Sequence, residues 1–224
     1  MQVPGNLRNS PRNAEALAVL LSNRAIQRLA GFASGKSYVN PTYGGVESSA
    51  GVFHTWAPGL YKYYAEKLGR LYDATPVLQS TFANSIWTAA SFNFGPRTVT
   101  HDHRDHANLA FGLCAITALG QFDWKRGGHL VLWDMEVVIE FPPGTTILIP
   151  SATLRHSNVD LHPGDTRMSF TQYSAGGLFR WVDQGFRTAA RLKAVDRKGK
   201  ERFDRESKER WEMGLGLFST LSEL

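Results

Sequence analysis

The chain has 224 residues, of which 42% are hydrophobic and 20% are charged, values that exclude a fibrous or broadly disordered protein. This length is sufficient for one domain with a sizeable apolar core. No apolar stretch reaches the ~20 residues of a membrane helix, and the N-terminus lacks the apolar segment of a secretory signal. We therefore predict an intracellular protein without a membrane partner.

The net charge of +5 is distributed unevenly along the chain. The segment from Arg187 to Arg210 holds ten Lys and Arg against five Asp and Glu, a surplus of 10 − 5 = +5 that equals the excess of the whole chain. Such a segment predicts a polyanionic partner such as nucleic acid, because each phosphate contact releases bound counterions. The alternative is a solvated helix with pairs four residues apart, Glu201 with Arg205 and Asp204 with Lys208.

Cys114 is the only cysteine, so an internal disulfide is excluded. It lies in an apolar run between Phe111 and Leu119, where a cysteine usually packs as a small hydrophobic side chain. We predict a buried, unreactive thiol and a reducing compartment.

Two helices are predicted before residue 80. Apolar residues at 17, 20, 21, 25 and 29 predict a helix from Asn13 to Ala30 after an irregular arm over residues 1–11. A Gly-, Ser-, Asn- and Pro-rich run from Ser34 to Gly51 then predicts an ordered loop or a lid. A second helix should follow Pro58 and extend to Tyr72, with apolar residues three and four positions apart.

Short strands separated by turns are predicted from Phe82 to Tyr173. Seven segments are rich in β-branched and aromatic residues, and Gly and Pro turns separate several of them. The predicted fold is therefore mainly β with flanking helices, an α+β protein with a double-stranded β-helix of the jelly-roll or cupin type. The seven segments are 86–94, 113–119, 129–133, 137–141, 145–149, 154–158 and 167–173.

The final part of the chain is predicted to be helical and basic, with one helix from Phe186 to about Arg210. This pattern divides a single domain, residues 1–224, into three parts. They are an N-terminal helical support at 1–80, the β-helix core at 81–177 and a C-terminal basic helical extension at 178–224.

Polar residues in the β-rich region suggest a metal site. His103 and Asp105 are two residues apart, so on a strand they would share a face. His156 from a later strand would complete a ligand set of two imidazoles and one carboxylate. Such a set leaves coordination positions open on Fe(II). Arg167 follows His156 by 167 − 156 = 11 residues, enough for a turn and a return strand, so its guanidinium could bind a carboxylate near the metal.

Other histidines near His103 leave a second ligand set open. The run His101-Asp102-His103 resembles the opening of a cupin metal site, which usually continues with a nearby Glu. No Glu occurs between Asp105 and Glu136. The pair of His103 with Asp105 is therefore preferred, and His101 and His106 are assigned to the surroundings of the metal, to the substrate entrance or to the surface.

These residues resemble the Fe(II)- and 2-oxoglutarate-dependent dioxygenase superfamily. Within it, the surrounding words are similar to the fungal branch of the TET/JBP-like nucleic-acid oxygenases associated with basidiomycete transposons. The similarity covers roughly residues 81 to 187. The matching words are His103-Arg-Asp-His-Ala-Asn-Leu109, Gly127-Gly-His-Leu130, Phe141-Pro-Pro-Gly144, Ser157-Asn158 and Arg167-Met-Ser-Phe-Thr-Gln-Tyr173.

The resemblance implies an oxidoreductase that uses Fe(II), 2-oxoglutarate and O2. His103, Asp105 and His156 would be the catalytic metal ligands, and Arg167, assisted by Ser169, would bind the distal carboxylate of 2-oxoglutarate. Asn93 is a further candidate for the co-substrate, Asn108 could contact either co-substrate or substrate, and His101 is a candidate for the substrate entrance. Asn93 and Asn108 could instead cap turns.

The TET/JBP-like resemblance also implies a substrate, the methyl group of 5-methylcytosine or of a related modified base in DNA or RNA, and such an enzyme could act in the nucleus. A flipped or single-stranded base is bound by stacking, and the candidate aromatic residues are Trp87, Phe92, Phe94, Trp124 and Trp133. A cysteine-rich zinc region for DNA, as in animal TET enzymes, is excluded by the single cysteine. Two alternatives stay open: an oxygenase of a protein side chain or small metabolite, and an inactive β-helix that serves as a binding module.

Overall fold

The computed structural model describes residues 44–220 and 223, apart from residues 79, 81, 83 and 84. Within this range, α3 (Gly44–Trp56) and α4 (Pro58–Ala74) precede seven strands. The strands are β1 (Ala89–Asn93), β2 (Cys114–Gln121), β3 (Leu130–Leu132), β4 (Val137–Ile139), β5 (Thr146–Ile149), β6 (His156–Asn158) and β7 (Thr166–Tyr173), with a 3-10 turn (Trp133–Met135) between β3 and β4. Three helices follow: α5 (Gly176–Asp183), α6 (Ala189–Val195) and α7 (Arg197–Leu215).

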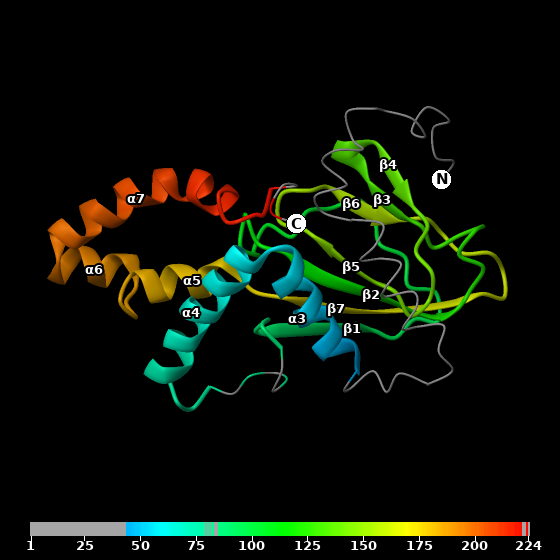
Figure 1. Ribbon diagram of the computed structural model, residues 1–224, viewed down its shortest axis with the longest axis horizontal. Coiled ribbons are helices and arrows are strands. Elements are labelled where there is room, and N and C mark those ends of the chain that lie inside the picture. Colours follow the sequence, from blue (N-terminus) through cyan, green and yellow to red (C-terminus); the bar gives the residue numbers. More distant parts are fainter. Residues whose placement is uncertain (1–43, 79, 81, 83–84, 221–222, 224) are drawn as a thin grey trace.

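The strands form two antiparallel sheets, one with the order β1-β7-β2-β5 and one with the order β4-β3-β6. The two sheets face each other (Figure 1). The chain moves repeatedly from one sheet to the other, and an additional bridge between His103 and His156 extends the second sheet beyond β6. This alternation is the double-stranded β-helix, so the predicted fold class is confirmed.

Alternating side chains of the larger sheet supply two cores. On β2, Cys114 and Ala118 face the smaller sheet, whereas Ala115 between them faces the helices. Ile149 and Leu148 on β5 divide in the same way, because successive side chains of a strand point to opposite faces. The helices α3 and α4 therefore cover one face of this sheet and the smaller sheet covers the other (Figure 1).

The helix predicted after Pro58 is confirmed as α4. Pro58 lies in its first turn, where a missing backbone N–H costs no hydrogen bond. Its buried residues are Leu60, Tyr64, Leu68 and Leu71, which follow the predicted spacing. The seven predicted strand segments also coincide with β1 to β7 within a few residues.

Two predictions about the flanking segments are wrong. The run from Ser34 to Gly51 was expected to be a loop, but residues 44–51 belong to α3. The basic segment forms two helices, because α6 ends at Val195 and Asp196 caps a new helix by accepting a hydrogen bond from the Gly199 N–H at 2.8 Å. The predicted helix from Asn13 to Ala30 and residues 34–43 lie outside the described residues, and the three-part division of the chain stays a prediction.

The two C-terminal helices lie beside each other at one end of the molecule, away from the sheets (Figure 1). Asp183 of α5 joins them to the body, because its carboxylate contacts Lys67 of α4 at 2.5 Å and Arg210 of α7 at 3.4 Å. Among the described residues, no helix has both the length and the apolar character needed to cross a bilayer.

The predicted packing role of Cys114 is confirmed. Its side chain is buried between the sheets, and burial raises the pKa of the thiol to about 12. The thiol is thus protonated near neutral pH and is a poor nucleophile.

We expect Leu60→Ala to lower the free energy of unfolding by about 2–5 kcal/mol, because it opens a cavity in the core between α4 and the larger sheet. Val77→Ala is the control, because Val77 is 84% exposed and its loss should cost less than about 0.5 kcal/mol. Urea unfolding of both variants measures the difference. Equal stability of the two variants would contradict the assigned core.

Candidate metal and anion site

Backbone pairing brings His103 and His156 together. Each residue donates its N–H to the carbonyl oxygen of the other at 3.0 Å, so the two are directly opposite in an antiparallel bridge. The expectation that one regular strand supplies both His103 and Asp105 is wrong. His103 forms an isolated bridge, and Asp105 lies in the following turn, where its N–H donates to the Ser151 carbonyl at 2.9 Å.

The side chains of His103, Asp105 and His156 converge. Their potential ligand atoms all lie within 4.8 Å of one another. His103 Nε2 is 3.5 Å from Asp105 Oδ1, and the two imidazole centroids are 4.4 Å apart. Divalent metal ions such as Zn²⁺ bind histidine nitrogen and carboxylate oxygen at about 2.0–2.2 Å. Two ligand atoms of one such ion are therefore at most roughly 4.4 Å apart. The three side chains could therefore hold one cation after small shifts.

Both imidazoles are oriented by backbone carbonyls two residues earlier in the chain. His103 Nδ1 lies 2.9 Å from the His101 oxygen, and His156 Nδ1 lies 2.9 Å from the Leu154 oxygen. A carbonyl only accepts, so each Nδ1 carries a proton, and in the neutral ring Nε2 is then the nitrogen with the lone pair that can bind a metal. Burial also lowers the pKa of His156, which favours the neutral form that can bind a metal.

Asp105 is held by the side chain of Asn108. The Asn108 amide donates to Asp105 Oδ2 at 3.3 Å and to the Ser151 hydroxyl at 3.2 Å. Such a contact orients a carboxylate ligand without touching the metal. Asn108 also lines the cavity, so its position is compatible with more than the capping of a turn.

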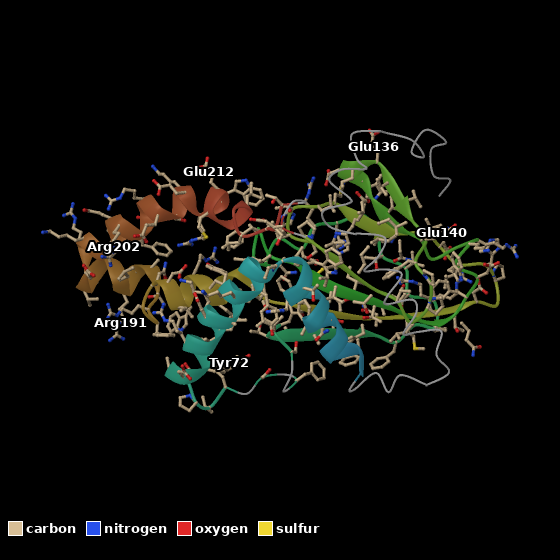
Figure 2. The ribbon with its side chains drawn as sticks, in the orientation of Figure 1. Tyr72, Glu136, Glu140, Arg191, Arg202 and Glu212 are labelled. Atoms are coloured by element: carbon tan, nitrogen blue, oxygen red, sulfur yellow. The ribbon has the colours of Figure 1, made fainter. Side chains whose placement is uncertain are left out.

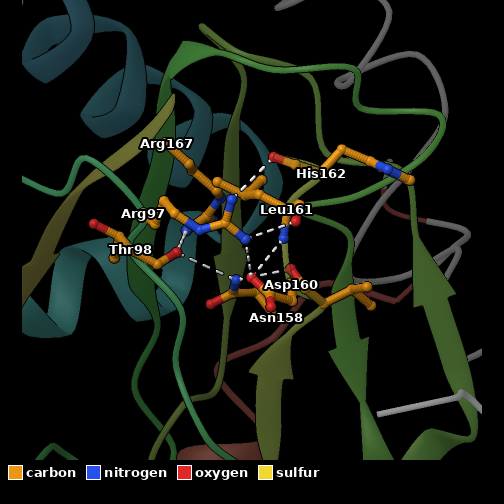
Figure 3. A network of polar contacts seen from close by, with 8 residues as sticks. Arg97, Thr98, Asn158, Asp160, Leu161, His162 and Arg167 are labelled. Atoms are coloured by element: carbon orange, nitrogen blue, oxygen red, sulfur yellow. Dashed lines mark hydrogen bonds and ion pairs between the residues drawn. The ribbon is translucent and has the colours of Figure 1, made fainter. Parts of the chain in front are cut away.

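Arg167 is a buried cation whose guanidinium has little to bind. Only 3% of the residue is exposed, and burial lowers its pKa to about 10. One nitrogen, NH1, donates to the Thr98 carbonyl at 3.3 Å, and Nε has no hydrogen-bond partner (Figure 3). No described carboxylate forms an ion pair with it. This includes Asp165, which lies two residues before Arg167 in the sequence. A buried charge without a counterion is unfavourable, so this environment suits an anionic ligand.

One cavity of about 480 Å³ contains both groups of residues. It is lined by the three potential metal ligands, by Arg167 and by the predicted Ser169, Asn93 and Asn108. The Asn93 amide donates to the Ser169 hydroxyl at 2.9 Å, because the two residues are opposite each other on β1 and β7. The volume is within the range of small-molecule sites.

His101 lies at the surface, one of the three locations expected for it. Its exposed side chain lines a neighbouring pocket of about 300 Å³ beside Trp133, not the cavity of the potential metal ligands. The backbone carbonyl of His101 orients the His103 imidazole, so His101 contributes to the site through its main chain. His106 does line the cavity, and a substrate role for the His101 side chain stays a prediction.

Several residues of the site were not identified as site residues from the sequence. Asn158 and Tyr173 line the cavity, and Ser151 supports both Asp105 and Asn108. Asn158 follows His156 by two residues on β6, and Tyr173 follows Ser169 by four on β7, so strand alternation could have indicated both. Ser151 contributes through a contact between distant segments, which no local pattern indicates.

No protein-family model matches this chain, and no curated protein is detectably similar to it in sequence. Similar solved structures include NgTET1 in complex with 5mC DNA, with a TM-score of 0.43 and 17% identity over 70% of this chain and 54% of that one. Another is the viral collagen prolyl hydroxylase of Paramecium bursaria Chlorella virus-1 in a 2OG complex, with a TM-score of 0.28 and 13% identity over 48% of this chain and 68% of that one. This chain thus spans about half the length of NgTET1.

We expect His156→Ala to abolish tight binding of Mn(II), a spectroscopic substitute for Fe(II), because it removes one of three ligands. His106→Ala is the matched control, because it removes an imidazole from the same cavity but not from the ligand set. Electron paramagnetic resonance of free Mn(II) during titration measures both. Equal Mn(II) affinity of the two variants would exclude the assigned ligand set.

Proposed function

We propose that this protein is an Fe(II)- and 2-oxoglutarate-dependent dioxygenase. The observation that carries the proposal is the presence, in one cavity, of a two-histidine, one-carboxylate cluster and a buried arginine without an anionic partner. This ligand set is characteristic of Fe(II) oxygenases because it leaves coordination positions open. The fungal TET/JBP-like branch stays a finer prediction from the sequence.

The residues suit a metal ion and a dicarboxylate together. His103, Asp105 and His156 would hold Fe(II), and Arg167 would bind the distal carboxylate of 2-oxoglutarate through two parallel hydrogen bonds. A divalent cation, a dicarboxylate, the Asp105 carboxylate and the Arg167 guanidinium sum to no net charge. The cavity therefore favours joint binding over binding of either ligand alone.

The protein residues act by orientation and by protection from water. The carbonyls of residues 101 and 154 direct both Nε2 atoms toward the metal position, and Asn108 directs the Asp105 carboxylate. Ser169, which accepts a hydrogen bond from Asn93, retains a hydroxyl proton that it can donate to a carboxylate near Arg167. When bound, Fe(II), 2-oxoglutarate and O2 supply the oxidising chemistry that hydroxylates a C–H bond and releases succinate and CO2.

We propose the methyl group of 5-methylcytosine, or of a related modified base, as the oxidised group. The cavity volume suits a small planar group, and Tyr173 lines it with its hydroxyl 3.2 Å from that of Ser91. A flipped base is bound by stacking and by hydrogen bonds to its edge, and Tyr173 can supply both. The aromatic residues expected for this purpose lie elsewhere: Trp87 is buried in the helix-covered core, and Phe92 and Phe94 stack on each other outside the cavity.

Anaerobic loading of the protein with Fe(II) and 2-oxoglutarate, followed by oxygen and a methylated oligonucleotide, tests the function. We expect succinate and a product that has gained one oxygen atom, both detected by mass spectrometry. Arg167→Met should raise the dissociation constant of 2-oxoglutarate by about 10- to 150-fold, the effect of losing hydrogen bonds to a charged group.

Arg155→Met is the control for this variant, because Arg155 is exposed and stacks over Trp133 on the other face of the sheet. It should bind 2-oxoglutarate as the unchanged protein does. Succinate formation that depends on a peptide or metabolite, and not on the oligonucleotide, would identify that compound as the substrate in place of nucleic acid. If the protein binds neither Mn(II) nor 2-oxoglutarate, the alternative of an inactive β-helix binding module remains.

We further propose that nucleic acid contacts the α6 end of the basic segment. Several bases of α7 are paired with acids one turn later: Arg197 contacts Glu201 at 3.2 Å, and Lys200 contacts Asp204 at 2.5 Å. These pairs also replace the sequence-based expectation of Glu201 with Arg205 and Asp204 with Lys208. The three bases at the α6 end are Arg187, which precedes the helix, and Arg191 and Lys193, which lie on it; all three are exposed and form no ion pair with a described residue.

The three bases at the α6 end have the character of a phosphate-binding region. Arg191 extends away from the rest of the molecule, whereas Arg202 lies on the neighbouring α7 (Figure 2), where it is 3.9 Å from Glu206. Cations without a nearby acid attract phosphates more strongly than cations that already have one. The polyanion proposal therefore moves from the whole segment 187–210 to its first third.

We expect replacement of Arg187, Arg191 and Lys193 by Gln to weaken oligonucleotide binding and to lower the slope of log Kd against log salt by up to about 3, roughly one for each phosphate that is no longer bound. Replacement of Lys62, Arg70 and Lys125 by Gln changes the charge equally on other elements and should leave the slope unchanged. Fluorescence anisotropy at several salt concentrations measures both. Equal slopes for the two triple variants would exclude this surface.

A further inference from the structure

Residues 96–100 connect the two sheets at the Arg167 end of the cavity, and we name them the 96–100 strap (Figure 3). On the side of the larger sheet, the Arg167 N–H donates to the Pro96 carbonyl at 2.7 Å, and the Thr98 N–H donates to the Arg167 carbonyl at 3.0 Å. On the side of the smaller sheet, the Thr100 N–H donates to Asn158 Oδ1 at 2.7 Å. The strap therefore spans from β7 to β6.

A buried carboxamide holds the inner face of the strap. Asn158 is 8% exposed, lines the cavity and lies two residues after His156 on β6. Its Oδ1 accepts from Thr100, and its Nδ2 is 3.4 Å from the Thr98 carbonyl. The same carbonyl accepts from Arg167 NH1 at 3.3 Å. One acceptor is thus shared between Asn158 and the buried guanidinium.

An arginine holds the outer end of the strap. The Arg97 guanidinium donates to the carbonyls of His162 and Leu161 at 3.0 and 2.7 Å, and to Asp160 Oδ1 at 2.9 Å (Figure 3). Arg97 therefore has ample partners, in contrast to Arg167, which has the Thr98 carbonyl and an unpaired Nε. The two neighbouring arginines differ accordingly: Arg97 fastens the strap, and Arg167 remains available for a ligand.

We propose that Asn158 is the positioning residue of the anion site, an inference that rests on the proposed function. By holding the Thr98 carbonyl and the Thr100 N–H, Asn158 fixes the acceptor that orients the Arg167 guanidinium. A guanidinium binds a carboxylate through two parallel hydrogen bonds only in the correct plane, and side chains around a site supply such orientation. Asn158 thereby couples the strand that carries His156 to the arginine that binds the distal carboxylate.

The test uses Asn158→Leu, which keeps a similar volume and removes both polar atoms. Isothermal titration under anaerobic conditions measures 2-oxoglutarate binding to the Mn(II)-loaded protein. We expect the dissociation constant to rise by about 3- to 10-fold, because the neutral hydrogen bonds of Asn158 to Thr98, Thr100 and Val159 are lost. Mn(II) affinity itself should change by less than about twofold, because Asn158 makes no contact with a ligand side chain.

A second ligand separates orientation of Arg167 from general damage. 2-Oxopentanoate has the same chain length as 2-oxoglutarate but lacks the distal carboxylate. Asn158→Leu should weaken 2-oxoglutarate and leave 2-oxopentanoate unchanged, so that selectivity between the two falls. Asn108→Leu is the opposite control: it releases Asp105 and should weaken Mn(II) by roughly 10-fold or more with little change in this selectivity.

The outcomes distinguish this inference from the proposed function. If the unchanged protein binds neither Mn(II) nor 2-oxoglutarate, the proposed function fails. If it binds both and Asn158→Leu keeps full selectivity for 2-oxoglutarate, the positioning role of Asn158 is refuted. If Asn158→Leu does not fold, Asn158→Asp replaces it, because it retains the acceptor for Thr100, loses the donor to Thr98 and should also lower the selectivity.

Discussion

The site depends on the backbone pairing of His103 with His156. Two hydrogen bonds of 3.0 Å hold together residues that are 156 − 103 = 53 positions apart in the sequence. Each imidazole is then oriented by the carbonyl two residues before it, so both rings follow the same local geometry, one from an isolated bridge residue and one from β6. Since the backbone sets both positions, the ligand cluster needs no metal to bring its histidines together. Asp105 joins them from the next turn, where Asn108 and Ser151 hold it.

The second constraint is electrostatic. The cavity contains one carboxylate and one buried guanidinium, and these two charges are not paired with each other. A protein rarely retains a buried cation without a partner unless a ligand completes it. Under the proposed function, a divalent cation next to Asp105 and a dicarboxylate next to Arg167 would neutralise both charges at once. The same reasoning applies to the 96–100 strap, because a guanidinium without a bound anion needs a fixed neighbouring group to hold its orientation.

The C-terminal arm, defined here as residues 187–215, contains bases that look equivalent in the sequence but have different partners in the structure. The arm has many bases, but on α7 an acid one turn later accompanies Arg197, Lys200 and Arg202. Arg210 is instead used internally, where it contacts Asp183 beside Lys67. From Arg187 to Lys193 every base is exposed and forms no ion pair with a described residue, whereas α7 holds both paired bases and the exposed Lys198, Arg205 and Lys208. The arm thus joins a partly neutralised, anchored helix to a short basic one.

The sequence by itself determined the strands of the β-helix and helix α4, and it predicted the cluster of two histidines and one aspartate and the arginine that lies in the same cavity. These features follow from local regularities: side-chain alternation, helical spacing and residue chemistry at fixed separations. Only the tertiary structure decided that His103 forms an isolated bridge, that the His101 side chain lies outside the cavity, that Asp196 divides the basic segment, and that the Thr98 carbonyl accepts from both Arg167 and Asn158. Each of these depends on contacts between segments distant in sequence or on competition between local caps, and a local pattern carries no information about which distant partner is present.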